Sequence, residues 1–322
     1  MRKQYLKTLF MISFLALMAV LILIYTILWY NGGKLQGKMV FANSYNNGEK
    51  VDKINIITAE DAVELELKNS YWLVKGKGEY YADFSKVHSF LTSVNSSSYL
   101  VKMPFSQELL ANKYLYNPKE QKENSGMLVQ IFAGDVLLDE IIIGLPDEDK
   151  KYYFVRNIDD DSVWQIDGNF KLPIMEKDWL LTPVFSVSPN TIESLGINNN
   201  IVTREDEHSD FTNEKGYKVN ADVLTNIFNY IEIQDVVKVD KADFKNFNTR
   251  EIYVTTFYGL RVNLTLYYNN QNDIWFSIKL LTTPLPMKIV NDYIKDNSFL
   301  YDDWYFKASS EQGHILRDFR LM

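Results

Sequence analysis

The stretch at residues 127–143, MLVQIFAGDVLLDEIII, decides the fold class of this chain. Residues 127–133 and 136–143 are apolar runs of strand length, and the Gly134-Asp135 pair between them is a two-residue turn signal. The pattern predicts a β-hairpin. Because a hairpin pairs its strands antiparallel, we expect an antiparallel sheet around it.

Similar patterns extend on both sides of this hairpin. Upstream, apolar residues alternate at 54–56, 63–67 and 72–74, which predicts three short strands of a meander. Asp83 then stands at an N-cap position before Phe84, Val87, Leu91 and Val94, which recur at helical spacing. Downstream, strands are predicted at 152–156 and 162–166, joined by the acidic turn 159–161. The fold class is therefore α+β.

The same order of elements recurs in the second half of the chain. We predict strands at 201–204 and 216–219, a helix at 223–231, a hairpin at 251–267 that turns at Tyr258-Gly259, and a strand at 274–280. The segments YADFSKVHSFL (81–91) and NADVLTNIFNY (220–230) share an Ala-Asp start. They indicate an internal duplication, although any helix of an α+β domain can begin with such a cap.

The repeated pattern predicts two related lobes of mainly antiparallel sheet with packed helices. The first lobe is expected at 51–172 and the second at 201–322, with a connecting segment at 173–200 between them. In that segment, residues 175–185 are expected to form a helix, with three prolines nearby as breakers. The second lobe is expected to end with a helix at 287–294 and two strands, around 304–306 and 315–316.

The N-terminus predicts a membrane anchor. Residues 8–30, TLFMISFLALMAVLILIYTILWY, are 23 uncharged residues, and at about 1.5 Å per residue they reach roughly 34 Å, enough to cross a bilayer. A cleaved signal peptide is the alternative, but its apolar region is shorter and ends in small residues, whereas this one ends in Leu28, Trp29 and Tyr30. Residues 31–50 would be a tether.

Flanking charge predicts the orientation of the anchor. Arg2, Lys3 and Lys7 precede the span, so the short N-terminus is expected in the cytoplasm and the bulk of the chain outside it. The expected location is the cytoplasmic (inner) membrane, crossed once, with a periplasmic or extracytoplasmic domain. Three of the 34 basic and none of the 42 acidic residues precede Asn31, so the rest of the chain carries a net charge of −11.

Composition excludes several classes of protein. The absence of Cys rules out disulfide scaffolds, thiol nucleophiles and Cys-ligated zinc, and the three His residues leave little for other metal chemistry. An excess of acidic over basic residues argues against a general nucleic-acid binder.

Motifs that carry chemistry are also missing. The chain has no phosphate-binding loop, no H-E-x-x-H and no nucleophile elbow, and Gly76-Lys77-Gly78 is interpreted as a turn. The acidic clusters at 147–149 and 159–161 are interpreted as solvated hairpin turns, because Trp164 takes the place where a calcium loop needs Gly. We therefore predict no catalytic, cofactor-binding or metal-binding residues, no cofactor, and no enzymatic activity.

The order of these elements resembles a bacterial family known as domain of unknown function 4340. The resemblance is carried by NSYWLVKGKGEYYADFSKVHSFLTSV (69–94), IIIG (141–144), YYFVR (152–156), SVWQID (162–167) and KDWLLTPVFSVSPNTIESLGI (177–197). It covers roughly residues 50–200 and continues more weakly to about residue 316. No catalytic residues are established for the family. The resemblance implies one N-terminal membrane helix and an association with gliding-motility-type ABC transport systems.

We therefore expect a non-catalytic accessory protein of a cell-envelope or ABC-type transport assembly, anchored by residues 8–30. Two alternatives remain open: an exported module that binds an envelope polymer or a small ligand in a cleft between the lobes, and a hydrolase that uses carboxylates without a recognisable motif. The sequence leaves the oligomeric state open.

Overall fold

The computed structural model describes Met18, Val20, Ile22 and residues 35–158, 162–168, 170, 174–269 and 273–321. The predicted span at 8–30 lies outside the described residues except for those first three, and the predicted acidic turn at 159–161 lies outside them entirely. Within the described ranges, no helix is long and apolar enough to cross a bilayer.

The chain forms two compact units. Unit 1 comprises residues 1–64 and 88–174, and unit 2 comprises residues 65–87 and 175–322. Residues 65–87, predicted as part of the first lobe, thus group with the C-terminal part of the chain. Unit 2 is therefore built from two segments that lie far apart in the sequence.

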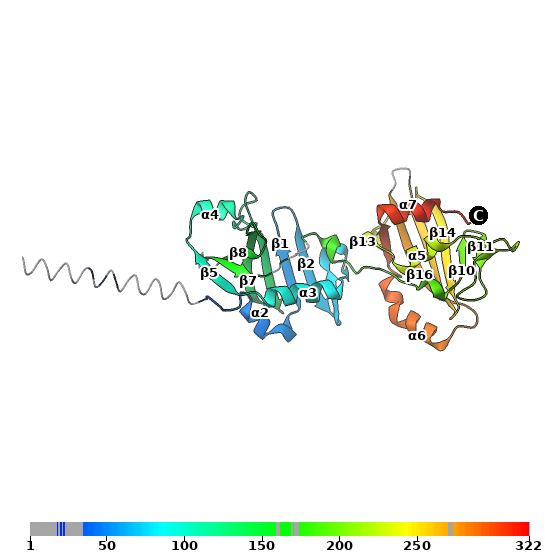
Figure 1. The fold of residues 1–322 in the computed structure, drawn as a ribbon, viewed down its shortest axis with the longest axis horizontal. Coiled ribbons are helices and arrows are strands. Elements are labelled where there is room, and N and C mark those ends of the chain that lie inside the picture. Colours follow the sequence, from blue (N-terminus) through cyan, green and yellow to red (C-terminus); the bar gives the residue numbers. More distant parts are fainter. Residues whose placement is uncertain are drawn as a thin grey trace, which may run out of the picture. The chain divides into compact units, whose positions relative to one another are not determined.

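The first sheet has nine strands in the order β4-β3-β2-β1-β6-β7-β8-β9-β5 (Figure 1). Its strands are β1 (Lys53–Ile57), β2 (Ala62–Lys68), β3 (Tyr71–Val74), β4 (Tyr80–Tyr81), β5 (Tyr99–Met103), β6 (Met127–Ala133), β7 (Val136–Pro146), β8 (Tyr152–Asn157) and β9 (Val163–Asp167). The predicted hairpin is confirmed as β6 and β7, which pair antiparallel from Met127 opposite Ile143 to Ala133 opposite Val136.

The second sheet has eight strands in the order β12-β11-β10-β14-β15-β16-β17-β13. Its strands are β10 (Ile192–Ile197), β11 (Asn200–Thr203), β12 (Thr212–Asn213), β13 (Ile233–Lys238), β14 (Asn248–Thr256), β15 (Leu260–Tyr268), β16 (Ile274–Thr282) and β17 (Trp304–Ala308). In β15 every second residue is buried, which matches the alternation expected of a half-buried strand.

The two sheets share one topology. Without β4, the first sheet reads 3-2-1-6-7-8-9-5 and the second reads 12-11-10-14-15-16-17-13, so each strand of one has a counterpart in the other. In both, a helix directly precedes the strand at the final edge: α3 (Phe84–Asn95) before β5, and α5 (Asp222–Asn229) before β13. This shared order fits the predicted internal repeat, and the α+β class with mainly antiparallel sheets is confirmed.

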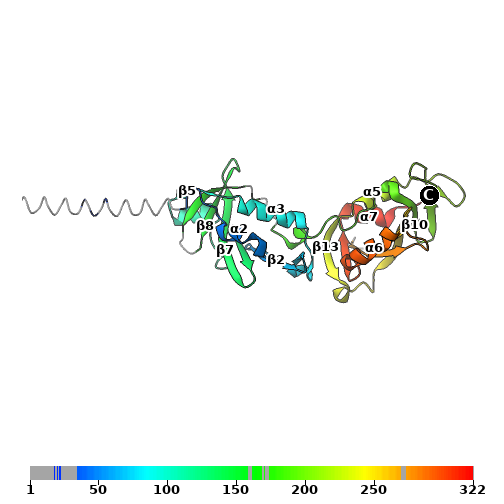
Figure 2. The ribbon, with the colours of Figure 1, turned by 90° about the horizontal axis from the view of Figure 1, so that it is seen from below.

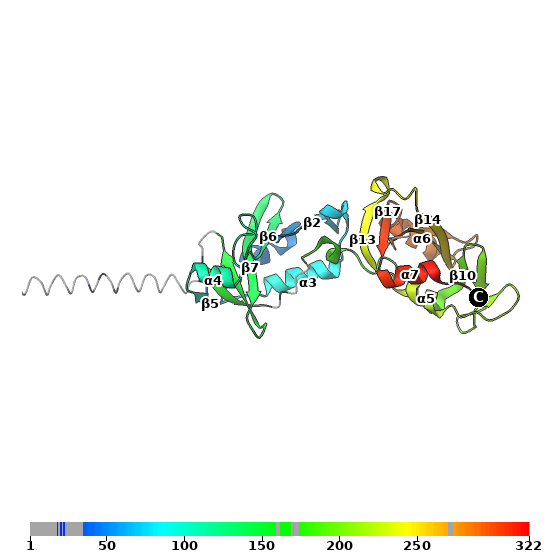
Figure 3. The same cartoon turned by 90° about the horizontal axis from the view of Figure 1, so that it is seen from above.

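Helices cover the sheets and close their ends. The remaining helices are α2 (Ala42–Asn46), α4 (Gln107–Asn112), α6 (Lys288–Asn297) and α7 (Ser310–Asp318), with short 3-10 turns at η1 (Gly48–Lys50), η2 (Lys75–Lys77), η3 (Glu176–Trp179), η4 (Pro189–Thr191), η5 (Val239–Lys241) and η6 (Ser298–Leu300). In unit 2, α5 and α7 lie on the same side of the sheet, as Figure 2 shows from below and Figure 3 from above. Asp83 caps α3 as predicted, because its Oδ1 accepts hydrogen bonds from the main-chain N–H groups of Ser85 and Lys86.

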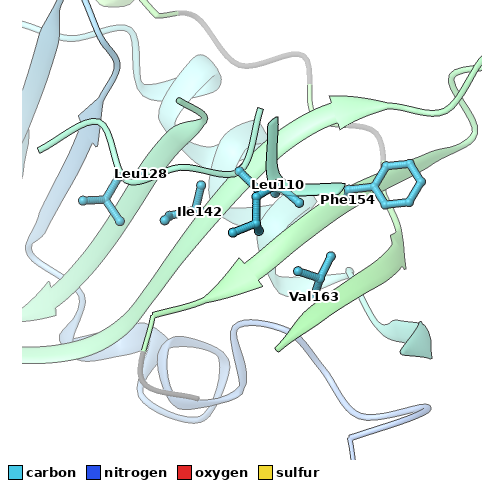
Figure 4. Close-up of a cluster of buried hydrophobic side chains, with 6 residues drawn as sticks. Leu110, Leu128, Ile142, Phe154 and Val163 are labelled. Carbon is cyan, nitrogen blue, oxygen red and sulfur yellow. The ribbon is translucent and has the colours of Figure 1, made fainter. Parts of the chain in front are cut away.

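One hydrophobic cluster in the core of unit 1 lies where α4 and the chain after it meet the hairpin. Six buried apolar side chains form it (Figure 4): Leu110, Leu115, Leu128, Ile142, Phe154 and Val163. They come from α4, the loop that follows it, and β6 to β9. The four consecutive strands of the meander are therefore tied together by a single cluster.

Three predicted elements are wrong. Residues 175–185 contain the 3-10 turn η3 followed by bends and isolated bridges at Leu180 and Phe185, and Pro183 has no N–H to donate within a helix. Residues 315–316 belong to α7, which begins where Ser309 caps it by accepting a hydrogen bond from Gln312 N–H. Residues 216–219 form a turn with a single bridge between Thr212 and Lys218 instead of a strand.

Candidate functional site

Unit 2 contains a cleft beside a segment that we call the strap and define as residues 177–185; it begins in η3 and continues without regular secondary structure. The strap first pairs with the end of β4, where Leu181 N–H donates to the carbonyl of Tyr81 at 3.0 Å. Further along, Val184 N–H donates to the carbonyl of Ile231, also at 3.0 Å. Between these two attachments the strap and the start of β13 separate, and a cleft of about 430 Å³ opens.

Charged side chains line this cleft in equal numbers. The charged lining residues are Lys86, Lys177, Asp178 and Glu232, and Leu180 and Ile233 supply apolar surface. The ammonium group of Lys86 donates a hydrogen bond to the main-chain carbonyl of Asp178 at 2.8 Å. One of its donor hydrogens is therefore already used within the protein. The cleft therefore offers a polar ligand mixed charges and no strong preference for one sign.

Five carboxyl groups of the described residues have a perturbed pKa. A carboxyl that serves as a general acid near neutral pH needs a raised pKa. In all five the pKa is lowered, because neighbouring Lys, Arg or main-chain donors stabilise the carboxylate. The five groups are Glu66, Glu79, Asp206, Asp273 and Asp318. None of the five lines the cleft. Among the described residues, no three His, Asp or Glu side chains gather closely enough to hold a metal ion.

A second feature of unit 2 is the loop that joins β16 to α6. Its two ends are fastened to the turn between β14 and β15, since Thr283 N–H donates to the carbonyl of Gly259 at 2.9 Å and Met287 N–H to that of Tyr258 at 3.0 Å. Gly259 has a φ of +91°, and a Cβ atom built there would lie 2.7 Å from the Cα of Pro286. Only glycine therefore allows this close approach.

This fastened loop presents apolar side chains to solvent. We define the Leu285 surface as Tyr258, Leu285, Met287 and Ile289, which are exposed by 47%, 92%, 52% and 71% respectively. Leu285 lies between Pro284 and Pro286, which restrict the backbone on both sides of it. The exposed position of Leu285 is thus held by two hydrogen bonds and two prolines.

Sequence reasoning did not single out the Leu285 surface. The signal available was the pattern Pro-Leu-Pro-Met-Lys-Ile at 284–289, in which apolar residues follow a strand without the spacing of a buried element. Two predictions about weaker motifs are confirmed. Gly76-Lys77-Gly78 is a turn with Gly78 at a φ of +67°, and the cluster at 147–149 lies in the turn between β7 and β8, where Asp147 Oδ1 accepts from the N–H groups of Lys151 and Tyr152.

Comparison with known proteins identifies the family of the chain. Neither the curated proteins nor the solved structures contain a match. The model of the family described as domain of unknown function (DUF4340) matches residues 72–250, more than half of the chain. The match extends from β3 of the first sheet to β14 of the second, and so takes in the strap and every residue that lines the cleft except Ser309. The chain is therefore a member of the domain of unknown function 4340 family.

Proposed function

We propose that this protein is a non-catalytic, membrane-anchored accessory protein of a cell-envelope or ABC-type transport assembly, and that it contacts a protein partner through unit 2. The Leu285 surface is the observation that carries this proposal. The anchor is the apolar run at residues 8–30, and the class of assembly follows from the family resemblance.

An exposed apolar surface that is held in place favours association with another protein. Leaving Leu285 at 92% exposure forgoes burial of a side chain that would gain about 1.5–3 kcal/mol in a partner's pocket. Because the loop is already fixed by Gly259 and its neighbours, little conformational entropy would be lost on binding. Contiguous exposed apolar side chains of this kind mark interaction sites in soluble domains.

The charges beside this surface favour a protein over an anionic lipid surface as the occupant. The helix α6, which continues the loop, carries Lys288 and Lys295 together with Asp292 and Asp296, so its formal charge is zero. A segment that binds anionic lipid needs an excess of basic residues. Apolar side chains with balanced charges are more typical of a protein–protein contact.

The two alternative functions have weaker support in the described part of the chain. A ligand-binding module would use the cleft beside the strap, where the lysine and carboxylate charges balance and Lys86 is engaged by the main chain. A hydrolase would need a carboxyl group with a raised pKa in such a cleft. The perturbed carboxyl groups named above have lowered pKa values and lie elsewhere in the chain.

Site-specific photocrosslinking in the native membrane tests the proposal. A photoreactive amino acid would replace Leu285 or Ile289 in the full-length protein, and Tyr217 would be the matched control because it lies in unit 2 and is 68% exposed. We expect permease or other integral-membrane subunits to be captured from positions 285 and 289 and not from 217. The same captured proteins at all three positions, or none at any, would contradict the proposal.

Replacement of residues 8–30 by an unrelated apolar span separates two modes of contact. If capture from position 285 survives the replacement, the partner is held by unit 2 alone. If capture is lost while the protein remains in the membrane, contacts within the bilayer contribute as well.

A further inference from the structure

The segment predicted as a tether is docked on unit 1. Gly37 N–H donates to the carbonyl of Tyr99 at 2.7 Å, Tyr99 N–H donates to the carbonyl of Lys38 at 2.9 Å, and Val40 N–H donates to that of Ser97 at 3.0 Å. These bonds continue the ladder beyond β5, which is the last strand of the first sheet. The chain that enters unit 1 therefore runs along the start of this edge strand.

The docking is reinforced by buried contacts. Phe41 and Ser44 are fully buried. Asp139 of β7 accepts a hydrogen bond from Ser44 N–H at 2.6 Å through Oδ2 and one from Asn43 Nδ2 at 3.2 Å through Oδ1. A buried carboxylate placed at the first turn of α2 stabilises the otherwise unpaired N–H groups there. Residues 37–46 thus form part of unit 1 instead of a flexible connection.

Chain length then limits how far this edge can be from the membrane. The predicted span ends at Tyr30, and Gly37 is the first described residue bonded to β5. The seven intervening steps reach at most about 24 Å at roughly 3.4 Å each. The start of β5 must therefore lie within about 24 Å of the point where the chain leaves the bilayer.

The surface at this edge has the composition of a lipid-contacting surface. We define the β5 rim as Met39, Val101 and Phe105, which are exposed by 37%, 50% and 49%, together with the exposed Lys38 and Lys102. The two stretches that supply it, 31–48 and 84–107, contain no acidic residue in a chain that has 42. Basic and apolar side chains within one short stretch of chain are what an interfacial segment needs.

We propose that the β5 rim rests on the phospholipid headgroup layer of the membrane in which residues 8–30 are anchored. The apolar side chains would enter the boundary between headgroups and acyl chains, while the two lysines meet lipid phosphates. Figure 1 and Figure 3 both show β5 at the outer rim of unit 1. This inference rests on the membrane anchor of the proposed function, and it adds the face that unit 1 turns towards the lipid.

The absence of cysteine makes a direct test simple, because a single introduced thiol can be labelled without removing any other. Full-length Val101→Cys and Phe105→Cys would carry an environment-sensitive fluorophore and be reconstituted in phosphatidylcholine vesicles with phosphatidylglycerol and a headgroup spin-labelled lipid. Glu60→Cys is the control, because it lies in the exposed turn after β1, five strands from β5 in the sheet, or about 24 Å at ~4.8 Å per strand.

We expect blue-shifted and quenched fluorescence at positions 101 and 105 and unquenched fluorescence at position 60. Because no partner protein is present in these vesicles, quenching can come only from lipid. Equal quenching at all three positions, or no quenching at 101 and 105, would overturn the inference. In the latter case the rim would instead be free to contact a protein.

Two further measurements separate the outcomes. Flotation with the vesicles after alkaline washing tests the anchor, so a protein that fails to float contradicts the proposed function, and one that floats without quenching contradicts only the rim. A flexible linker inserted between Lys34 and Leu35 tests whether the rim has affinity of its own. Quenching that persists with the linker supports lipid binding, whereas its loss would mean that the short connection alone holds the rim near the membrane, contrary to the proposal.

Discussion

Replacing Asp139 by Ala is predicted to release the N-terminal segment from unit 1 without unfolding the unit. Asp139 is only 8% exposed and belongs to β7, whereas the groups that it binds, Asn43 and Ser44, lie almost one hundred residues earlier in the chain. Alanine removes both acceptor oxygens and leaves the strand pairing of β7 intact, because that pairing uses main-chain groups. The substitution therefore weakens one long-range attachment selectively.

The size of the effect follows from the two shorter of the three hydrogen bonds that Asp139 accepts, because the third, from Asn43 N–H, is 3.4 Å long and adds little. A bond from a buried N–H to a charged carboxylate contributes about 1.5–3 kcal/mol, and the more exposed bond from the Asn43 side chain about 0.5–1 kcal/mol. Together they amount to about 2–4 kcal/mol, and at about 1.4 kcal/mol per tenfold change the opening equilibrium should rise roughly 30- to 700-fold. Asp139→Asn retains one carbonyl acceptor without the charge and should lose about half of this free energy.

Amide hydrogen exchange of the full-length protein measures this opening. Protection factors should fall by the stated ratio for residues 40–47, which lie in and around α2, and should be unchanged in the hairpin of β6 and β7. Unchanged protection at 40–47 in a folded Asp139→Ala protein would refute the assigned role of the carboxylate. An equal loss of protection throughout the hairpin would show that Asp139 supports the whole unit instead of this attachment.

Three further predictions concern unit 2. Gly259→Ala should lower its unfolding free energy by about 2 kcal/mol more than Gly216→Ala, since both glycines have positive φ but only the former meets Pro286 within 3 Å; equal losses in chemical denaturation would contradict the packing argument. Arg250→Met should lower the unfolding free energy by about 2–3 kcal/mol and weaken the attachment of α7, because the buried guanidinium of Arg250 donates to two main-chain carbonyls at the C-terminal end of that helix. Unchanged amide exchange of α7 would contradict this prediction. A hydrogen bond from Lys75 lowers the pKa of Glu79 to about 2, so the contribution of this pair to stability is present above about pH 4.5 and is lost as the pH falls towards 2. Because the pair is partly exposed, the loss of unfolding free energy should stay below ~1 kcal/mol, and an NMR titration should show a higher Glu79 pKa in Lys75→Met.

Local signals were sufficient to predict much of the fold. The hairpin of β6 and β7 followed from two apolar runs around Gly134-Asp135, and the start of α3 followed from Asp83 before an apolar helical pattern. Both depend on residues within a few positions of each other, so no information from the rest of the chain was needed. The repeated order of elements was likewise visible because each copy carries its own local signals.

The elements that were predicted wrongly depend on contacts that the local pattern does not contain. The adjacent Ile315 and Leu316 suggested a strand, but α7 begins at the Ser309 cap and packs Gly313 closely on Ala308 and Ile274. A Cβ atom at position 313 would lie 3.1 Å from that of Ala308, so close packing selects the small residue. A glycine inside a short polar helix lowers its helical propensity, and tertiary packing has overridden that preference.

The surfaces proposed for function were not predictable for a related reason. In the sequence, Leu285 is not distinguishable from other loop residues. Only the hydrogen bonds from Thr283 and Met287 to the turn between β14 and β15 show that this loop is held in place. The sequence indicates only that Asp139 is a polar residue in a half-buried strand, and its role depends on the hydrogen bond from Ser44 N–H. In both cases the deciding contact joins segments that are distant in the chain, across the two strands β15 and β16 for Leu285 and across almost one hundred residues for Asp139.

The buried charged side chains in the described part of the chain hold distant chain segments together. The charged side chains buried there are Asp139 and Arg250. The first holds the N–H groups at the start of α2, and the second holds the carbonyls at the end of α7, so both are engaged by the main chain. Under the proposed function, these internal attachments keep the two segments in place, while the apolar side chains held outward at Leu285 supply the contact with a partner.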